Sequence, residues 1–178
     1  GSALLYNGNT GGNNQQPQIV SLSSPNGGID NITSYIDGFQ EITVMDANNQ
    51  IEIGNAVWVG SSASTQQWYG LIPEVIIYDR ELSGNDLSKM QTYLALKYGI
   101  TLGQPAALNY MASDDTIIWD NTANTGYNND VAGIGRDDLS ALKQKQSKTV
   151  NNDAVVTIGL GTIAATNAAN SNTFSNDL

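Results

Sequence analysis

The chain contains no histidine and no cysteine. Without histidine, neither a Ser-His-Asp nor a Cys-His nucleophilic system can be built, and the usual zinc sites lose most of their ligands. Without cysteine, disulfide bonds contribute nothing to stability, so the fold depends on packing or on bound ions. These two absences exclude the commonest nucleophilic and zinc chemistry, and we expect that the protein is not an enzyme.

Basic residues are also few. Lys and Arg number 7 against 17 Asp and Glu, which leaves a formal net charge of -10. Nucleic-acid binding requires clustered cations facing phosphates. The one basic cluster, Lys143, Lys145 and Lys148, lies in a Gln- and Ser-rich stretch without aromatic residues. We interpret it as a solvated strand or loop face and expect no nucleic-acid partner.

Long apolar runs are missing as well. No stretch approaches the roughly 20 residues that a transmembrane helix requires, so we expect no direct membrane insertion. The first residues do not form a basic-then-apolar signal sequence. A signal removed further upstream is compatible with such a start, and export therefore stays open.

The residues that are present favour a β-rich domain with a real core. Hydrophobic residues make up 40% of 178, which suits one domain or two small ones. Charged residues are only 13%, while Asn, Ser, Thr and Gly are abundant. This composition is typical of a surface-exposed, mainly β protein.

The strongest local signals join one strand to one helix. Residues 75–78 form a β-branched and aromatic run, which predicts a strand. An amphipathic helix is predicted near 83–98, with Ser83 as N-cap, Asp86 in the first turn and Gly99 as a left-handed C-cap. Helical spacing predicts that the apolar face consists of Leu87, Met90, Leu94 and Tyr98.

Short strands separated by turn residues come before the helix. One strand is expected at 18–22. The clearest hairpin has residues 32–36 and 39–44 on either side of Asp37-Gly38, a dipeptide that fits a type I′ turn. Short strands followed by one helix predict an antiparallel β-sandwich.

The composition shifts after Gly99. Residues 100–108 contain Gly103 and Pro105 and form the predicted linker, so we divide the chain into 1–102 and 103–178. The second part is expected to be β-rich and incompletely represented. Its predicted elements are strands at 116–119, 131–134 and 154–158 and a short helical turn at 140–146.

Several stretches resemble known families. WYGLIPEVIIYDRELS is similar to the closing strand of LamG-like, concanavalin A-like jelly-roll domains, and SYIDGFQEI resembles their strand-turn-strand unit. The continuation, from SKMQTYLALKYGITL through YMASDDTIIWD and GYNNDVAGIGRDD to VTIGLG, resembles a module that follows LamG-like domains in very large surface proteins of Bacteroidetes and marine bacteria. The resemblance implies a jelly-roll sandwich, then a module without assigned activity, at the bacterial cell surface.

The resemblance also implies missing strands. A LamG-like jelly roll needs about 200 residues, within the range of single β domains, and only about 80 precede the helix here. A truncated start, a companion fragment and a reduced sheet each explain this difference. An isolated half-sandwich would expose unpaired strand edges, which favours strand complementation by another chain.

Acidic residues suggest calcium more than catalysis. Glycosidases of this fold group place several acids on one strand, in a Glu-x-Asp-x-x-Glu type of run, and the chain has none. Asp and Asn in loops offer the hard oxygen ligands that calcium prefers. The predicted metal ligands are Asp114, Asp115, Asp120 and Asp130. The competing interpretation is that these residues make turns by bonding their own backbone.

Aromatic residues raise a second binding hypothesis. Trp68 and Tyr69 follow a polar loop and form the predicted platform on which a sugar ring could stack, while Trp58, Trp119 and Tyr127 are further aromatic candidates. The competing interpretation is burial in the core, where large rings contribute most.

Two classes of function therefore remain open. The first is a non-catalytic structural or adhesive module of a large secreted or cell-surface bacterial protein, with a surface glycan or another protein chain as its partner. The second is a carbohydrate-binding or carbohydrate-active concanavalin A-like domain. Calcium is the one cofactor expected in either case.

Overall fold

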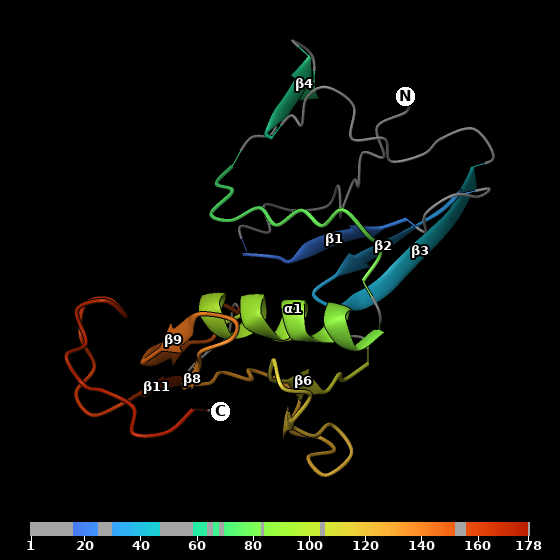
Figure 1. The fold of residues 1–178 in the computed structure, drawn as a ribbon. Helices are drawn as coiled ribbons and strands as arrows, with labels where there is room; N and C mark the ends of the chain where they lie inside the picture. The colour runs from blue at the N-terminus through green and yellow to red at the C-terminus, as the bar shows by residue number, and fades with distance from the viewer. Residues whose placement is uncertain are drawn as a thin grey trace.

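The computed structural model describes residues 16–24, 30–46, 59–63, 66–67, 70–82, 84–103, 106–151 and 156–177. These residues form small antiparallel sheets and one helix (Figure 1). The mainly β prediction holds at this level, whereas no closure into a sandwich or jelly roll is seen within the described part of the chain. No described helix has both the length and the apolar character needed to cross a membrane.

The first sheet contains the predicted hairpin. Its order is β1 (Val20–Ser23), β2 (Asp30–Ile36) and β3 (Phe39–Asp46), all antiparallel. The turn between β2 and β3 has positive φ at both Asp37 and Gly38, as a type I′ turn requires. The hairpin prediction is confirmed, and the strand expected at 18–22 corresponds to β1.

Helix α1 (Gly84–Tyr98) confirms the predicted helix. The predicted cap Ser83 lies outside the described residues. At the other end, Gly99 has φ 69, and a Cβ there would lie 1.9 Å from the carbonyl oxygen of Lys148. Only glycine meets both demands, so this residue ends the helix and also allows a close backbone crossing.

The buried face of α1 differs from the expected one. The buried residues are Gln91, Thr92, Ala95 and Leu96, whereas Leu87, Met90, Leu94 and Tyr98 are half-buried. The helix lies between the first sheet and the strands of the second part (Figure 1). Because neighbours cover the helix from two sides, its small and polar residues are buried where those neighbours approach closest. The spacing of apolar residues alone therefore predicted the wrong face of α1 as the buried one.

The strand predicted at 75–78 is wrong for the described structure. Residues 71–78 belong to no sheet, and their backbone runs as an extended trace past the first sheet (Figure 1). Their large side chains are exposed to solvent, including Val75, Ile76, Ile77 and Tyr78. Strand propensity makes the backbone extended, but a ladder also needs a neighbouring strand, and no described strand lies in register with this segment.

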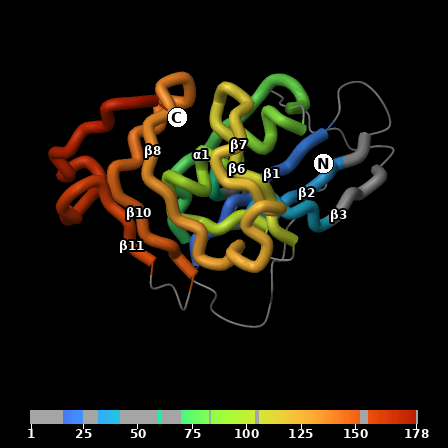
Figure 2. Tube along the Cα trace, turned by 90° about the horizontal axis from the view of Figure 1, so that it is seen from below, coloured from blue at the N-terminus to red at the C-terminus, as the bar shows by residue number. Residues whose placement is uncertain are grey.

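The remaining strands form small two-stranded units. They are β4 (Ser61–Ala63) with β5 (Gln66–Gln67), β6 (Tyr110–Met111) with β7 (Ile117–Trp119), β8 (Gly135–Asp137) with β9 (Leu142–Gln144), and β10 (Gln146–Lys148) with β11 (Thr157–Gly159). Figure 2 shows the first sheet and the β8 to β11 region on opposite sides of α1 and β6–β7.

These units correct several sequence predictions in the second part. The strand at 116–119 is confirmed by β7, and the one at 154–158 overlaps β11. The strand at 131–134 is wrong, because pairing begins at Gly135. The helical turn at 140–146 is also wrong, because this stretch holds strands β9 and β10 after a turn that Ala141 closes with φ 55. Burial alternates along β9, which is the period of a strand.

One hydrophobic core joins both predicted parts. It consists of Ile19, Ala95, Leu96, Ile100, Leu102, Tyr110 and Leu142. Tyr110 packs edge to face on Trp119, with ring centroids 5.6 Å apart. Its hydroxyl oxygen accepts a hydrogen bond of 2.8 Å from the amide of Leu102. The predicted division after residue 102 therefore passes through a shared core.

The C-terminal segment is organised by a buried asparagine. Asn170 is 1% exposed, and its amide group donates to the carbonyls of Leu160 and Thr162. The Lys145 ammonium donates to the backbone carbonyl of Asn170. A polar centre of this kind replaces apolar packing in a segment rich in Asn, Ala and Thr, since its buried groups are hydrogen-bonded.

The Asp37 turn links the first sheet to the chain after α1. Its amide donates to the Ile19 carbonyl at 2.9 Å, one carboxylate oxygen accepts from the Ile19 amide at 2.8 Å, and its carbonyl accepts from the Gly103 amide at 2.8 Å. Burial raises the pKa of the Asp37 carboxyl to about 6, while the hydrogen bond from Ile19 opposes this shift. The nearby titratable group is the Tyr110 hydroxyl.

The variant Asp37→Asn tests this electrostatic cost. A carboxyl with a raised pKa favours folding below about pH 4, and this contribution is lost as pH rises through about 6. Asparagine keeps the acceptor and tolerates positive φ without titrating. The full shift corresponds to about 3 kcal/mol, which partial exposure reduces to about 1–2 kcal/mol. We expect the variant to be more stable by that amount at pH 7.5, and equally stable at pH 4, in urea unfolding. An equal gain at both pH values would contradict the titration of Asp37.

Candidate functional site

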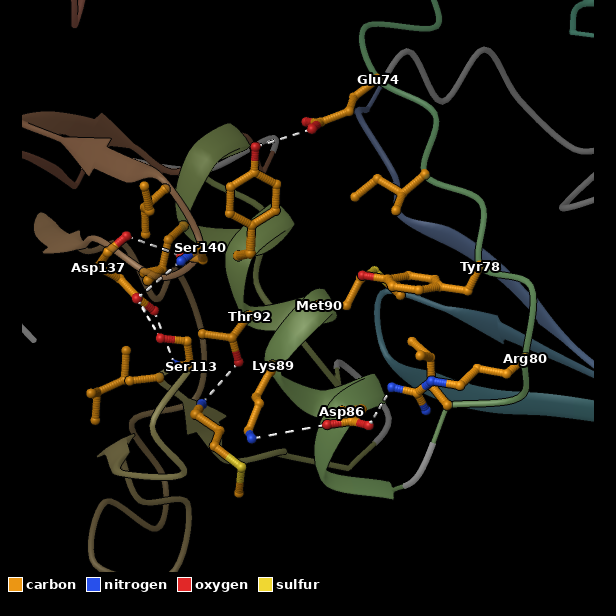
Figure 3. A pocket seen from close by; sticks show the side chains of 18 residues that line it. Glu74, Tyr78, Arg80, Asp86, Lys89, Met90, Thr92, Ser113, Asp137 and Ser140 are labelled. Carbon is orange, nitrogen blue, oxygen red and sulfur yellow. Dashed lines mark hydrogen bonds and ion pairs between the residues drawn. The ribbon is translucent and has the colours of Figure 1, made fainter.

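A concave cleft runs along α1. It has a volume of about 390 Å³ and is lined by residues of the 74–82 segment, of α1, and of the turns near Ser113 and Asp137 (Figure 3). We call it the α1 cleft. Its apolar lining includes Ile76, Met90, Leu96, Ile118 and Leu142.

The extended 74–82 segment forms one wall of the α1 cleft. Successive side chains of an extended chain point to opposite sides. Glu74, Ile76 and Tyr78 accordingly line the cleft, while Val75 and Ile77 do not. The extended conformation that β-branched residues favour therefore sorts this segment into a cleft-facing and an outward-facing row.

Glu74 attaches this wall to the last turns of α1. Its carboxylate accepts hydrogen bonds from the hydroxyls of Tyr93 at 3.0 Å and Tyr98 at 2.9 Å, and it pairs with the Lys97 ammonium at 3.0 Å. Lys97 also lies over the Tyr93 and Tyr98 rings, 4.9 and 5.7 Å from their centroids. Cation-π attraction therefore adds to the ion pair.

The charges around Glu74 keep the carboxylate ionised. Burial alone would raise its pKa, but the hydrogen bonds from Lys97, Tyr98 and Tyr93 outweigh burial and hold the pKa below its usual value. The hydrogen bond to Tyr93 and the bond to Glu74 raise the pKa of Lys97. Both shifts stabilise the charged pair at neutral pH.

A chain of ion pairs closes the other end of the α1 cleft. Arg80 contacts Asp86 at 3.1 Å, and Lys89 lies 4.0 Å from Asp86 and 2.7 Å from Asp115. Asp86 lies in the first turn of α1, where a negative charge also favours the helix dipole. These groups are partly exposed, so each pair contributes little energy but orients the Arg80 end of the wall.

Asp137 is the most buried carboxyl of the α1 cleft, at 7% exposure. It accepts hydrogen bonds from the amide and hydroxyl of Ser113 and from the amide of Ser140. Burial acts to raise its pKa, but these donors outweigh burial and lower it. Ser113 and Asp137 thereby join two turns through an ionised carboxylate.

The predicted metal ligands are engaged separately in local interactions. Asp114 accepts from the Thr116 amide at 2.9 Å, and Asp120 accepts from the amides of Thr122 and Ala123 at 2.7 and 3.0 Å. All three bonds are of the side-chain-to-backbone type that makes Asx turns.

The other two predicted ligands are tied to different parts of the chain. Asp115 pairs with Lys89, and Asp130 accepts from the Asn151 amide group at 2.8 Å. Among the described residues, no group of three or more acidic side chains is placed to hold a metal ion. The four carboxylates thus do not form one site, and calcium binding elsewhere in the chain stays a prediction.

The predicted sugar platform, Trp68 and Tyr69, lies outside the described residues, as does Trp58. Trp119 is half-buried against Tyr110, in agreement with the core interpretation. Tyr127, in contrast, is 79% exposed and follows a turn in which its amide donates to Asn124. It is the described aromatic side chain most open to a ligand.

Sequence reasoning missed the group formed by Glu74, Tyr93, Lys97 and Tyr98. Tyr93 and Lys97 are spaced i,i+4 on a helix, which predicts contact between them. Nothing local links them to Glu74, which lies 19 residues before Tyr93. The helical spacing of the three α1 residues was the available signal.

The variant Glu74→Ala tests how strongly this wall is attached. The substitution removes the carboxylate that accepts from the Tyr93 and Tyr98 hydroxyls and from the Lys97 ammonium. Because these three donors lose their acceptor, we expect the unfolding free energy at pH 7 to decrease by about 2 kcal/mol. Because the pKa of Glu74 is lowered, its contribution should decrease as pH falls below its ordinary value of 4.5. Urea unfolding at pH 7 and pH 3 measures both effects.

The matched control is Glu81→Ala. Glu81 is an exposed acid of the same segment, with a single side-chain bond of 3.2 Å from Ser23. We expect a change below about 0.5 kcal/mol. Equal effects of the two substitutions would contradict the role assigned to Glu74.

Comparison with known proteins places this structure in a family. Residues 86–178 match the family described as Domain of unknown function (DUF8202). The match covers more than half of the chain, which therefore belongs to this family. No curated protein and no solved structure matches the chain. The matched region begins within α1, ahead of the predicted division after residue 102, and so includes most of the helix together with the strands that pack on it.

Proposed function

We propose that this member of the DUF8202 family is a non-catalytic structural or adhesive module of a large secreted or cell-surface bacterial protein. The observation that carries the proposal is the shared core, in which Ile19 of the first part packs with α1 and with Leu142 of the second. Such a core resists relative movement of the two parts. Its role would be to hold neighbouring regions of a long surface protein in a defined arrangement.

The polar contacts support the same role. The Asp37 turn joins the first sheet to the chain after α1, and Glu74 and Arg80 each join the 74–82 segment to α1 itself. Charged groups that are used in this way stabilise one relative placement of the segments and are not free to act on a substrate. We also propose that residues 1–102 belong to a LamG-like sandwich, supported by the Asp-Gly hairpin and the extended segment before the helix.

A second candidate function is carbohydrate binding, and Tyr127 is the observation that favours it. Its ring is 79% exposed and is preceded by a turn held by Asp120 and by Thr125, whose hydroxyl donates to the Thr122 carbonyl at 2.8 Å. A rigid exposed ring loses little entropy when a sugar stacks on it. The predicted partners are accordingly a surface glycan or another protein chain.

A glycan array separates the two candidates. If the module is structural, we expect no saturable binding by the purified chain. Saturable binding that Tyr127→Ala or Trp68→Ala abolishes, but that Leu139→Ala leaves unchanged, would contradict the structural proposal and support the carbohydrate one. Leu139 is a suitable control because it is 82% exposed and lies in a different turn.

Thermal unfolding tests the calcium prediction. An ion that binds only the folded chain stabilises it in proportion to its saturation. The sequence predicts that millimolar calcium raises the melting temperature by several degrees, that EDTA reverses the rise, and that magnesium does not reproduce it. An unchanged transition in calcium would contradict the prediction.

A further inference from the structure

The outward row of the extended segment is half exposed to solvent. Val75 and Ile77 are 50% and 52% exposed, and both are β-branched. The backbone of residues 71–78 makes no hydrogen bond to another described element. An extended, apolar and unpaired backbone is a template for pairing with another strand.

The segment is also held in place at two points. Glu74 is bonded to Tyr93, Tyr98 and Lys97 of α1. Arg80 is paired with Asp86 in the first turn of the helix (Figure 3). Five residues, 75–79, therefore run extended between two attachments on the same helix. A segment that is already extended loses less conformational freedom when a strand pairs with it.

We propose that this segment pairs with the same segment of a second copy of the chain, as an antiparallel ribbon with its two-fold axis at Ile77. In this register, the residue n positions before Ile77 in one copy lies opposite the residue n positions after Ile77 in the other copy. Glu74 then lies opposite the partner's Arg80, while each keeps its contact to α1 of its own chain, and Ile76 lies opposite the partner's Tyr78. Opposite charges and aromatic–aliphatic pairs are both favourable cross-strand neighbours.

The register also agrees with the position of proline. In an antiparallel pair, alternate residues exchange hydrogen bonds with the partner strand. If Glu74, Ile76, Tyr78 and Arg80 are the hydrogen-bonding residues, Pro73 falls at a position that needs no donor. The segment is thus complementary to itself in charge, side-chain shape and backbone donors, which is why a second copy is the partner that fits. This pairing does not depend on the proposed module function.

The net charge of -10 acts against association of two copies. Salt weakens the repulsion between distant exposed charges of the two copies more than it weakens the short-range contacts within the ribbon. Dimerisation should therefore strengthen as ionic strength rises from 0.02 M to about 0.15 M.

Disulfide trapping tests the register, because the chain has no cysteine of its own. In Ile77→Cys the two sulfur-bearing residues meet at the axis as a non-hydrogen-bonded pair, with Cα atoms about 4.5 Å apart, within disulfide range. In Val75→Cys the equivalent residues are about 13 Å apart along the ribbon. We expect mild oxidation to give at least tenfold more covalent dimer with Cys at 77.

Two results of this trapping experiment would overturn the proposal. Equal trapping at 75 and 77 would indicate a parallel or unspecific contact. No trapping at 77 would indicate that a strand of another protein, or no strand, covers the segment. The double variant Val75→Cys, Asp79→Cys serves as a positive control, since these positions face each other across the axis and should cross-link.

Lysine substitutions and sedimentation equilibrium provide an independent test. Ile77→Lys places two ammonium groups opposite each other and should give a monomer of 18.9 kDa. Val75→Lys, on the same outward row, faces the partner's Asp79 and should keep the dimer. The helix signal in circular dichroism shows that both variants fold. The unsubstituted chain is measured in the same way at about 0.15 M salt and about 200 μM protein, a concentration that detects weak pairing. If sedimentation shows only monomer under these conditions, the proposal is refuted.

Discussion

The burial of α1 from two sides is the constraint on which the rest of the structure depends. Ala95 and Leu96 are in the core with Ile19 from before the first sheet and with Leu142 from β9. The glycine at position 99 allows the Lys148 backbone to approach the end of the helix closely. Apart from the first sheet, each described sheet has only two strands, and a two-stranded sheet is marginally stable by itself. The helix is therefore the element that gives these units a common core.

Polar groups determine how the segments around the helix are oriented. Apolar burial is non-directional, so it holds segments together without selecting one arrangement. Hydrogen bonds at Asp37, Glu74 and Asp137 are directional, and each is supplied by residues distant in sequence. These three acidic residues therefore act as acceptors that join distant segments of the fold.

Sequence reasoning succeeded where the signal is local. The Asp37-Gly38 turn and the helix that ends at Gly99 were both predicted, because turn type and helix termination depend on residues a few positions apart. It failed at 131–134 and 140–146, where short stretches carry weak signals and packing decides between strand and turn. For the candidate site, the Asp-rich turns around Asp120 were visible, but the link from Glu74 to Tyr93 was not.

The sequence by itself determined the absence of His and Cys chemistry, the strong negative charge, the hairpin turn and the position of the helix. Only the tertiary structure decided which face of α1 is buried, that residues 71–78 are extended without a ladder, and that Glu74 bonds to the helix. The physical reason is range. Capping, turn conformation and propensity act within a few residues, whereas ladders, cores and ion pairs need partners that only the complete packing brings together.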